Sequence, residues 1–439
     1  MKPRPSLSVL VLALALALAA APVRAADVLD LPIGDAARRD HSVPLVLDAV
    51  TDSRSGQLIG PGELAARLDG VRLLLVGENH TSMEFHRVQL RILEELVARG
   101  RTVAIGLEMY PATAQAQLER WSSDPKLTEA DFLTDSRWYL NWGYNWNYYR
   151  DIFLLAHRHR LPMYGLNVPR KIVSTMRKEG RDALTPEQAQ LLPERIDTDS
   201  AEHRRLVRAM FDDPDGLHGA MSDEQFEGMY RAQCTWDGAM AHNALRALAA
   251  SKDESTILVV LVGSGHVAYG LGLERQARLS FGGKIASVVP VTVEDPDTDA
   301  QVESVRGSFA DFVWGVPLEH DPLYPSLGLA TSEGTEGGPL EVLFVNEGSV
   351  AETAGFAAGD RLVAMDGTAL DGRETLNRLM AAKRWADDTV FSIRRGEQEI
   401  SLLVHFRRTL DEPETPAAES PETSGAKAPE PQPSAGGSR

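Results

Sequence analysis

Residues 71–80 read VRLLLVGENH, an apolar run broken only by Arg72 and followed by Gly77, Glu78, Asn79 and His80. A continuous rather than alternating apolar run is typical of a strand that is covered on both faces. Four further runs of this kind are separated by helical patterns, at residues 102–107, 161–166, 256–262 and 285–293. We therefore expect an α/β domain of three layers with a mostly parallel sheet. Residues 185–250 are too long for a simple crossover and predict a helical insertion.

Acidic, amide, phenol and imidazole side chains stand at the ends of the predicted strands. In chain order they are Glu78, His80, Glu108, Tyr110, Asn167 and His266, with His86 one turn into the helix after the first strand. Ligands of open parallel sheets bind outside the carboxyl ends of the strands. His80 and His266 each follow a glycine by three positions, and glycine permits a sharp turn and a close approach. We expect Glu78, His80, Glu108 and His266 to share one cavity.

The residue types at these strand ends suit two kinds of chemistry. His80, His266 or Tyr110 could each offer an axial ligand to a haem iron. Glu78 and Glu108 beside two imidazoles suit a divalent metal, or a general acid and base. Residues 137–149 are rich in aromatic side chains that either line a ligand cavity or form one buried helical face, since Trp138, Trp142 and Trp146 recur every four residues.

The same residues resemble the sequence blocks of the ChaN-type haem-binding uptake family of the Tiki superfamily. The blocks are LVGENH at 75–80 with His86 and Gln89, GLEM at 106–109, GLN at 165–167 and GSGHV at 263–267, and the resemblance spans about 46–293. It implies a three-layer α/β domain over residues 45–295 and an exported haem-binding protein with a role in iron uptake. Haem would contact Glu78, His80, His86, Glu108, Tyr110, Asn167 and His266. The resemblance also allows a homodimer.

Relatives in the Tiki, TraB and erythromycin esterase group are hydrolases, some of them metal-dependent. The resemblance therefore carries an alternative, a metal-dependent esterase or peptidase in which Glu78 and Glu108 are catalytic and His80 and His266 hold a divalent metal. We favour a binding protein and leave open whether the chain is an enzyme. Many ChaN-type proteins are lipoproteins, but this chain has no cysteine near its N-terminus for lipid attachment.

A second resemblance covers residues 325–406. The stretch GSVAETAGFAAGDRLVAMDG at 348–367 resembles the PDZ signature. This implies a small α+β PDZ domain at 321–408 after a linker at 296–320. Leu327, Gly328 and Leu329 match the loop whose backbone amides capture a peptide's C-terminal carboxylate. The domain would recruit a protein partner by its tail; the alternative is a degenerate PDZ fold that only docks on its neighbour.

Composition and the two ends bound the remaining possibilities. Residues 1–25 have Lys2 and Arg4, then an apolar run and small residues, which predict a cleaved signal peptide and a periplasmic or secreted protein. Residues 409–439 are acidic and rich in proline, which predicts disorder. A formal net charge of −18 argues against a nucleic-acid partner. The single cysteine, Cys234, excludes an intramolecular disulfide and Cys-rich zinc or iron–sulfur sites.

Overall fold

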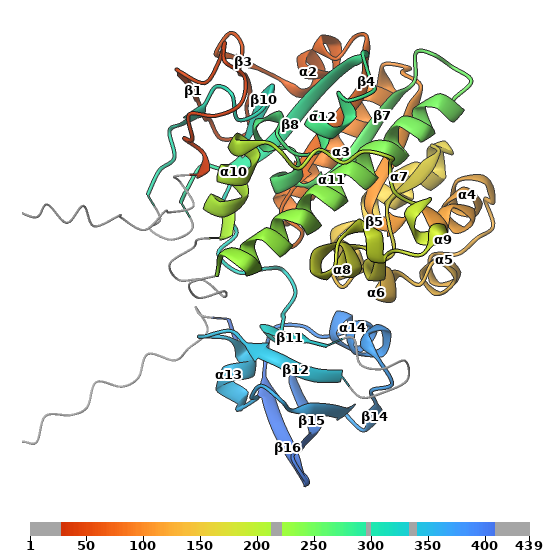
Figure 1. Cartoon of the computed structure of the whole chain (residues 1–439), viewed down its shortest axis with the longest axis vertical. Coiled ribbons are helices and arrows are strands. Elements are labelled where there is room, and N and C mark those ends of the chain that lie inside the picture. Colours follow the sequence, from red (N-terminus) through yellow and green to blue (C-terminus); the bar gives the residue numbers. More distant parts are fainter. Residues whose placement is uncertain (1–27, 212–221, 296–299, 333–339, 409–439) are drawn as a thin grey trace, which may run out of the picture.

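The computed structural model describes residues 28–211, 222–295, 300–332 and 340–408, which form two folded units (Figure 1). The predicted signal peptide (1–25) and acidic tail (409–439) lie outside the described residues. Within the described ranges, no helix combines the length and apolar character needed to cross a membrane.

The first unit is built on an eight-stranded, mostly parallel sheet in the order β3-β2-β10-β8-β4-β7-β5-β6. The strands are β2 (Val50–Asp52), β3 (Gln57–Ile59), β4 (Val71–Glu78), β5 (Val103–Pro111), β6 (Met163–Asn167), β7 (Ile257–Gly263), β8 (Lys284–Thr292) and β10 (Phe312–Val316). The five strands predicted from sequence all form and pair in parallel, while β2 and β3 are antiparallel. The predicted mixed α/β fold is confirmed.

Helices cover both faces of this sheet, and alternate residues of β4 point to opposite cores. Leu74 and Val76 pack in one core, together with α3 (Met83–Ala98) and α7 (Arg150–His159). Leu73 and Leu75 pack in the other core, together with α11 (Asp223–Ala250) and α12 (Leu273–Ala277). A fully buried strand has no solvated face, and this explains the continuous apolar run.

The remaining helices of the first unit follow the predicted crossovers and insertion. They are α2 (Pro61–Arg67), α4 (Gln115–Ser123), α5 (Glu129–Asp135), α6 (Trp138–Asn141), α8 (Arg170–Lys178), α9 (Pro186–Ala189) and α10 (Ala201–Phe211), with single 3-10 turns η1 (Ala112–Ala114), η2 (Trp146–Tyr148), η3 (Arg181–Ala183), η4 (Ser264–His266) and η5 (Ala268–Gly270). The predicted insertion thus contains α9, α10 and α11. Helices α9 and α11 begin at capping boxes, in which Thr185 and Ser222 cap the first turn.

The predicted linker at 296–320 requires a correction. Its described part contains β9 (Ser304–Arg306), which pairs with β1 (Ser42–Pro44), and β10, which lies in the main sheet between β8 and β2. Residues before the predicted start at 45 also belong to the core, since Leu31 and Ile33 are buried there. The sequence interpretation missed β10 because this strand lies beyond the expected end of the domain at 295.

The second unit is a six-stranded antiparallel sheet with two helices. Its strands run in the order β11 (Leu329–Thr331), β12 (Leu340–Val345), β13 (Arg361–Met365), β15 (Asp388–Arg395) and β16 (Gln398–His405), and β14 (Thr368–Ala369) pairs with β13. The helices are α13 (Val350–Ala354) and α14 (Arg373–Ala381). Leu362, Phe391 and Phe406 are fully buried in a core of its own. Helix α14 contacts α6 of the first unit (Figure 1).

Candidate functional site

The tips of three neighbouring strands bring Glu78, His80, Glu108 and His266 together. Glu78 at the end of β4 stands opposite Gly263 of β7 in the parallel register. The Gly263 backbone N–H donates to Glu108 Oε2 over 2.7 Å, and His266 Nε2 lies 3.6 Å from Glu108 Oε1. His80 Nδ1 donates to Glu78 Oε1 over 2.7 Å. The His80 side chain is 27% exposed, whereas the other three are at most 11% exposed.

The two Gly/His turns interlock across β4 and β7. A Cβ on Gly77 would stand 2.7 Å from Ser264 Oγ, and a Cβ on Gly263 would stand 3.2 Å from His80 Cε1. Each glycine therefore makes room for a side chain of the other turn. This gives a steric reason for a glycine three positions before each histidine.

Glu78 is a buried carboxylate that fixes the orientation of His80. Besides the His80 bond, it accepts hydrogen bonds from Tyr149 Oη over 2.7 Å and from Gln89 Nε2 over 2.8 Å. Burial alone raises the pKa of Glu78, but the charges of His86 and His80 and the bonds from His80 and Tyr149 outweigh burial and lower it to about 2. Glu78 is thus ionised at neutral pH. Its bond to His80 Nδ1 leaves Nε2 as the ring nitrogen that can meet a ligand.

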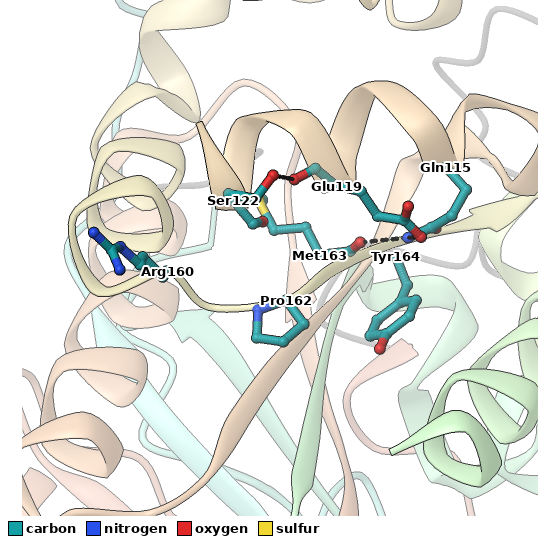
Figure 2. Close-up of a pocket in the computed structure, with 8 residues that line it drawn as sticks. Gln115, Glu119, Ser122, Arg160, Pro162, Met163 and Tyr164 are labelled. Carbon is teal, nitrogen blue, oxygen red and sulfur yellow. Dashed lines mark hydrogen bonds between the residues drawn. The ribbon is translucent and has the colours of Figure 1, made fainter. Parts of the chain in front are cut away.

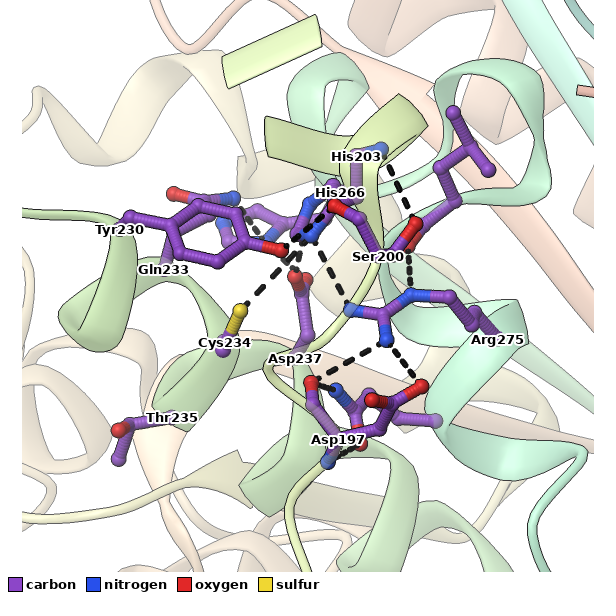
Figure 3. Close-up of polar contacts among 12 residues, drawn as sticks. Asp197, Ser200, His203, Tyr230, Gln233, Cys234, Thr235, Asp237, His266 and Arg275 are labelled. Carbon is purple, nitrogen blue, oxygen red and sulfur yellow. Dashed lines mark hydrogen bonds and ion pairs between the residues drawn. The ribbon is translucent and has the colours of Figure 1, made fainter. Parts of the chain in front are cut away.

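His266 lies between the carboxylates of Asp237 and Glu108, and its contact with Asp237 is shown in Figure 3. Its Nδ1 lies 2.6 Å from Asp237 Oδ1, and its Nε2 faces Glu108. Burial lowers the pKa of His266, but the Asp237 and Glu108 carboxylates raise it to about 10. The same pairing lowers the pKa of Glu108 despite its burial. His266 is therefore an imidazolium held in a charged array. The pKa of His80 is also raised, since its bond to Glu78 and the charges of Glu108 and Glu78 outweigh burial, so the two histidines differ chiefly in exposure.

Two residues of this site escaped the sequence reasoning. Asp237 on α11 is fully buried beside His266, and the other oxygen of its carboxylate lies 3.5 Å from His203 Nε2 (Figure 3). Tyr149 reaches Glu78 from 71 positions away in the chain. Asp237 and Gln233 stand one helical turn apart, and Gln233 Nε2 also lies 2.9 Å from His266 Nδ1. That four-residue polar spacing on a buried helix was the available signal.

The remaining predicted residues occupy three different places. His86 is buried beneath the site, with its Nδ1 3.6 Å from Glu78 Oε2. Asn167 Nδ2 donates to the Glu108 backbone carbonyl over 3.1 Å. Tyr110 lies apart from the four, because its hydroxyl pairs with Ser136 Oγ over 2.8 Å inside the aromatic core. Burial raises the pKa of Tyr110, which further disfavours it as an iron ligand.

The aromatic segment 137–149 combines both uses that the sequence left open. Trp138, Trp142 and Trp146 are all buried, but they do not share one helix, because α6 ends at Asn141. The rings of Trp142 and Tyr144 each lie 4.9 Å from the His80 ring, measured between centroids. We call these two side chains the aromatic wall. The segment therefore packs in the core and also flanks the site.

A surface hollow of about 550 Å³ lies elsewhere, between α4 and β6 (Figure 2). Gln115 borders it and bonds the β6 backbone twice, donating to the Met163 carbonyl and accepting from the Gly165 N–H. These bonds cover the edge of the end strand. None of the predicted site residues lines this hollow.

A dedicated metal centre finds no support in the structure. Among the residues with described positions, no group of three or more His, Cys, Asp or Glu side chains is placed to hold a metal ion. The carboxylates instead bind the imidazoles, Glu78 with His80 and Asp237 with His266.

Residues 64–276 match the family model described as haem-binding uptake, Tiki superfamily, ChaN. This match supports a ChaN-type assignment for the first unit. The solved structure of cofacial haem binding to ChaN of Campylobacter jejuni is 16% identical, covers 62% of this chain and 98% of its own, and gives a TM-score of 0.49. The curated proteins give no match.

Two other solved structures are more distant from this chain. A mutant of the erythromycin esterase EreC, in its open conformation, is 13% identical over 63% of this chain and 97% of its own, with a TM-score of 0.36. The PDZ domain of HtrA3, bound to a phage-derived ligand, is 17% identical over 18% of this chain and 82% of its own, with a TM-score of 0.17. Likenesses at this level carry no functional argument for either unit.

Proposed function

We propose that the first unit binds haem at the carboxyl edge of its sheet, with His80 as the axial ligand. The observation that carries this proposal is the hydrogen bonding and exposure of the His80 ring. Its Nδ1 is held by buried Glu78, its side chain is partly exposed, and its Nε2 remains to meet iron. A carboxylate behind a ligating imidazole is a recurrent arrangement in metal sites. The match to the ChaN-type family model, which describes haem-binding uptake proteins, supports haem as the bound group.

The residues around His80 fit this group. Haem needs an axial ligand and flat apolar surface, and the rings of Trp142 and Tyr144 stand beside the imidazole. Haem would supply the iron. The chain itself would orient His80 through Glu78, hold Glu78 through Tyr149, and keep water from the ligand with the aromatic wall.

Haemin titration of the purified protein tests the proposal. The wild type should give a saturable Soret shift that His80→Ala removes. His159→Ala is the matched control, because His159 is an exposed imidazole at the far end of α7. A wild type without a saturable shift, or a His80→Ala protein that titrates like the wild type, would refute haem binding at this residue.

Export, a role in iron or haem uptake and dimerisation belong to the same proposal. The predicted signal peptide supports export to the periplasm or beyond. N-terminal sequencing of the mature protein should begin near Ala26, and light scattering with and without haemin should detect a dimer. A mature chain that keeps Met1 and stays in the cytosolic fraction would contradict export.

For the second unit, we infer a PDZ-type module that binds the C-terminal tail of a protein partner. Strand β11 is an end strand that pairs with β12 on one side, and an extended peptide can add to such an edge. Gly328 in the preceding loop has φ of +72°, which favours glycine. A phage library of free C-terminal peptides should enrich a motif whose amidated peptides do not bind. Absence of enrichment would count against the module.

A second function is favoured by one observation, the array of Asp237, His266 and Glu108. An imidazole between two carboxylates is suited to acid–base work on an ester or peptide bond. Turnover of p-nitrophenyl acetate should then fall to the buffer rate in Glu108→Gln and drop in Glu78→Gln. A wild type no faster than buffer rejects this candidate.

A further inference from the structure

The backbone on either side of the aromatic wall is held by the second unit. Asn377 on α14 donates from Nδ2 to the Tyr139 carbonyl over 2.8 Å. Asn145 donates in return from Nδ2 to the carbonyl of Ala381, the last residue of α14, over 2.9 Å. These two bonds lie on opposite sides of Trp142 and Tyr144 in the chain, so they fix the segment that carries both rings.

Direct packing links α14 to the wall itself. Gly143 separates the two wall residues, and a Cβ built on it would lie 3.4 Å from Asn377 Nδ2. The Asn377 side chain therefore lies against the backbone between Trp142 and Tyr144. An ion pair between Arg137 Nη2 and Glu374 Oε2, 2.7 Å apart, adds a third link at the start of the segment.

A separate contact fixes the far end of the segment. The Tyr324 N–H donates to Tyr148 Oη over 3.2 Å, and the two rings meet edge to face with centroids 5.2 Å apart. Arg384, just after α14, stands 4.8 Å above the Tyr324 ring. Tyr149, the next residue along, donates to Glu78. Helix α14 thus contacts the segment of the aromatic wall directly, while Arg384 reaches the other flank of His80 only through Tyr324, which lies before β11 and packs on the core of the first unit.

We propose that the second unit is a working part of the haem site, in which Asn377 and Glu374 of α14 act as positioning residues for the aromatic wall beside His80. This inference rests on the proposed haem function. It predicts that haem affinity depends on α14 although α14 contributes no ligand. Since α14 belongs to the unit proposed to bind a partner's tail, a peptide that moves this helix changes haem affinity as well.

Asn145→Asp tests the link with little other damage. The Asn145 Oδ1 atom accepts from the Asn147 N–H, and aspartate keeps that acceptor. The substitution removes only the donor to Ala381 and puts a negative charge beside the carbonyl end of α14, which repels it. Losing this partly buried hydrogen bond should weaken haemin binding about tenfold in the Soret titration of the full chain. An unchanged or tighter haemin affinity overturns the proposal.

A charge exchange separates positioning from general damage. Arg137→Glu and Glu374→Arg should each weaken haemin binding by a factor of about three, and the double exchange should restore it, because an exposed ion pair contributes modestly. Glu399→Arg is the matched control, since it breaks a pair with Arg394 in the β15–β16 hairpin of the same unit. Failure of the double exchange to rescue, or an equal loss in the control, overturns the assignment of Glu374.

Hydrogen exchange of the haem-free protein keeps the two proposals distinguishable. Asn145→Asp should speed amide exchange across residues 137–149 while leaving β4 and β7 unchanged. If the wild type binds no haemin but this exchange still rises, the proposed function fails and the positioning role stands. If haemin binds and exchange across 137–149 is unaltered, the positioning role fails alone.

Discussion

Replacing Glu78 by glutamine should destabilise the first unit by about 3 kcal/mol at pH 7. The Glu78 side chain is fully buried, and its pKa falls from an ordinary 4.5 to about 2. Each pKa unit corresponds to about 1.4 kcal/mol. Ionised Glu78 therefore contributes roughly 3 kcal/mol that a neutral isostere lacks.

The hydrogen bonds give a similar magnitude. Glu78 Oε1 accepts from His80 and Tyr149, and Oε2 accepts from Gln89. Glutamine can keep an oxygen at the Oε1 position and meet Gln89 with its amide, provided that the Gln89 amide turns over. The bonds then survive but lose the help of the charge, at about 1 kcal/mol each.

The pH dependence has a definite sign. Because the folded pKa of Glu78 lies below its unfolded value, its contribution is complete above about pH 4.5 and is lost as pH falls through about 2. The stability gap between wild type and Glu78→Gln should therefore be constant from pH 5 to 7 and shrink to about half near pH 3.

Urea unfolding followed by tryptophan fluorescence measures this gap. Six of the seven tryptophans lie in the first unit and one, Trp385, in the second. Glu94→Gln on the exposed face of α3 is the matched control and should change stability by less than about 0.5 kcal/mol. A gap below about 1 kcal/mol at pH 7, or one that does not shrink toward pH 3, would refute the reasoning.

Three further substitutions have outcomes set by single contacts. Gly77→Ala puts a methyl group against Ser264 and should lower the free energy of unfolding by about 1–3 kcal/mol in urea titrations. Adding Ser264→Gly should recover part of that loss, and no recovery would contradict the interlocked turns. Asp237→Asn weakens the 2.6 Å charged bond to His266 Nδ1 and should lower the urea midpoint by the equivalent of about 2 kcal/mol. An unchanged midpoint would show that this bond does not stabilise the fold. Asp360→Asn weakens the two-pronged bond to Arg395 and should cost the second unit about 2 kcal/mol in thermal unfolding by circular dichroism, while the first unit melts unchanged.

The parallel strands could be predicted from the sequence because a strand that is buried on both faces consists almost entirely of apolar residues. Strands β4 and β7 are covered on both faces, so they read as continuous apolar runs. Once the strands are parallel, their carboxyl ends share an edge, and the polar residues at 78, 108 and 266 must approach each other. Strand β10 is also a buried apolar stretch, but it joins the sheet from beyond the expected domain end and was therefore placed in the linker.

The partners of the site residues could not be predicted from spacing. Tyr149 and Asp237 come from a turn–helix junction and a long helix, and their contacts depend on how these elements pack on the sheet. The same holds for Asn145 and Asn377, each of which donates to a backbone carbonyl of the other unit. Such contacts depend on tertiary geometry, and a single sequence carries no record of it.

The two Gly/His turns look equivalent in sequence but differ in their surroundings, and the difference comes from residues outside the repeated pattern. At the first turn, Glu78 satisfies one nitrogen of His80 and leaves the ring partly open beside the aromatic wall. At the second turn, Asp237 and Glu108 enclose His266 on both sides and keep it protonated. Burial lowers the pKa of His80, but its bond to Glu78 and the charges of Glu108 and Glu78 outweigh burial and raise it as well. The two imidazoles therefore differ in access: His80 is 27% exposed beside the aromatic wall, whereas His266 is 11% exposed and lies between Asp237 and Glu108.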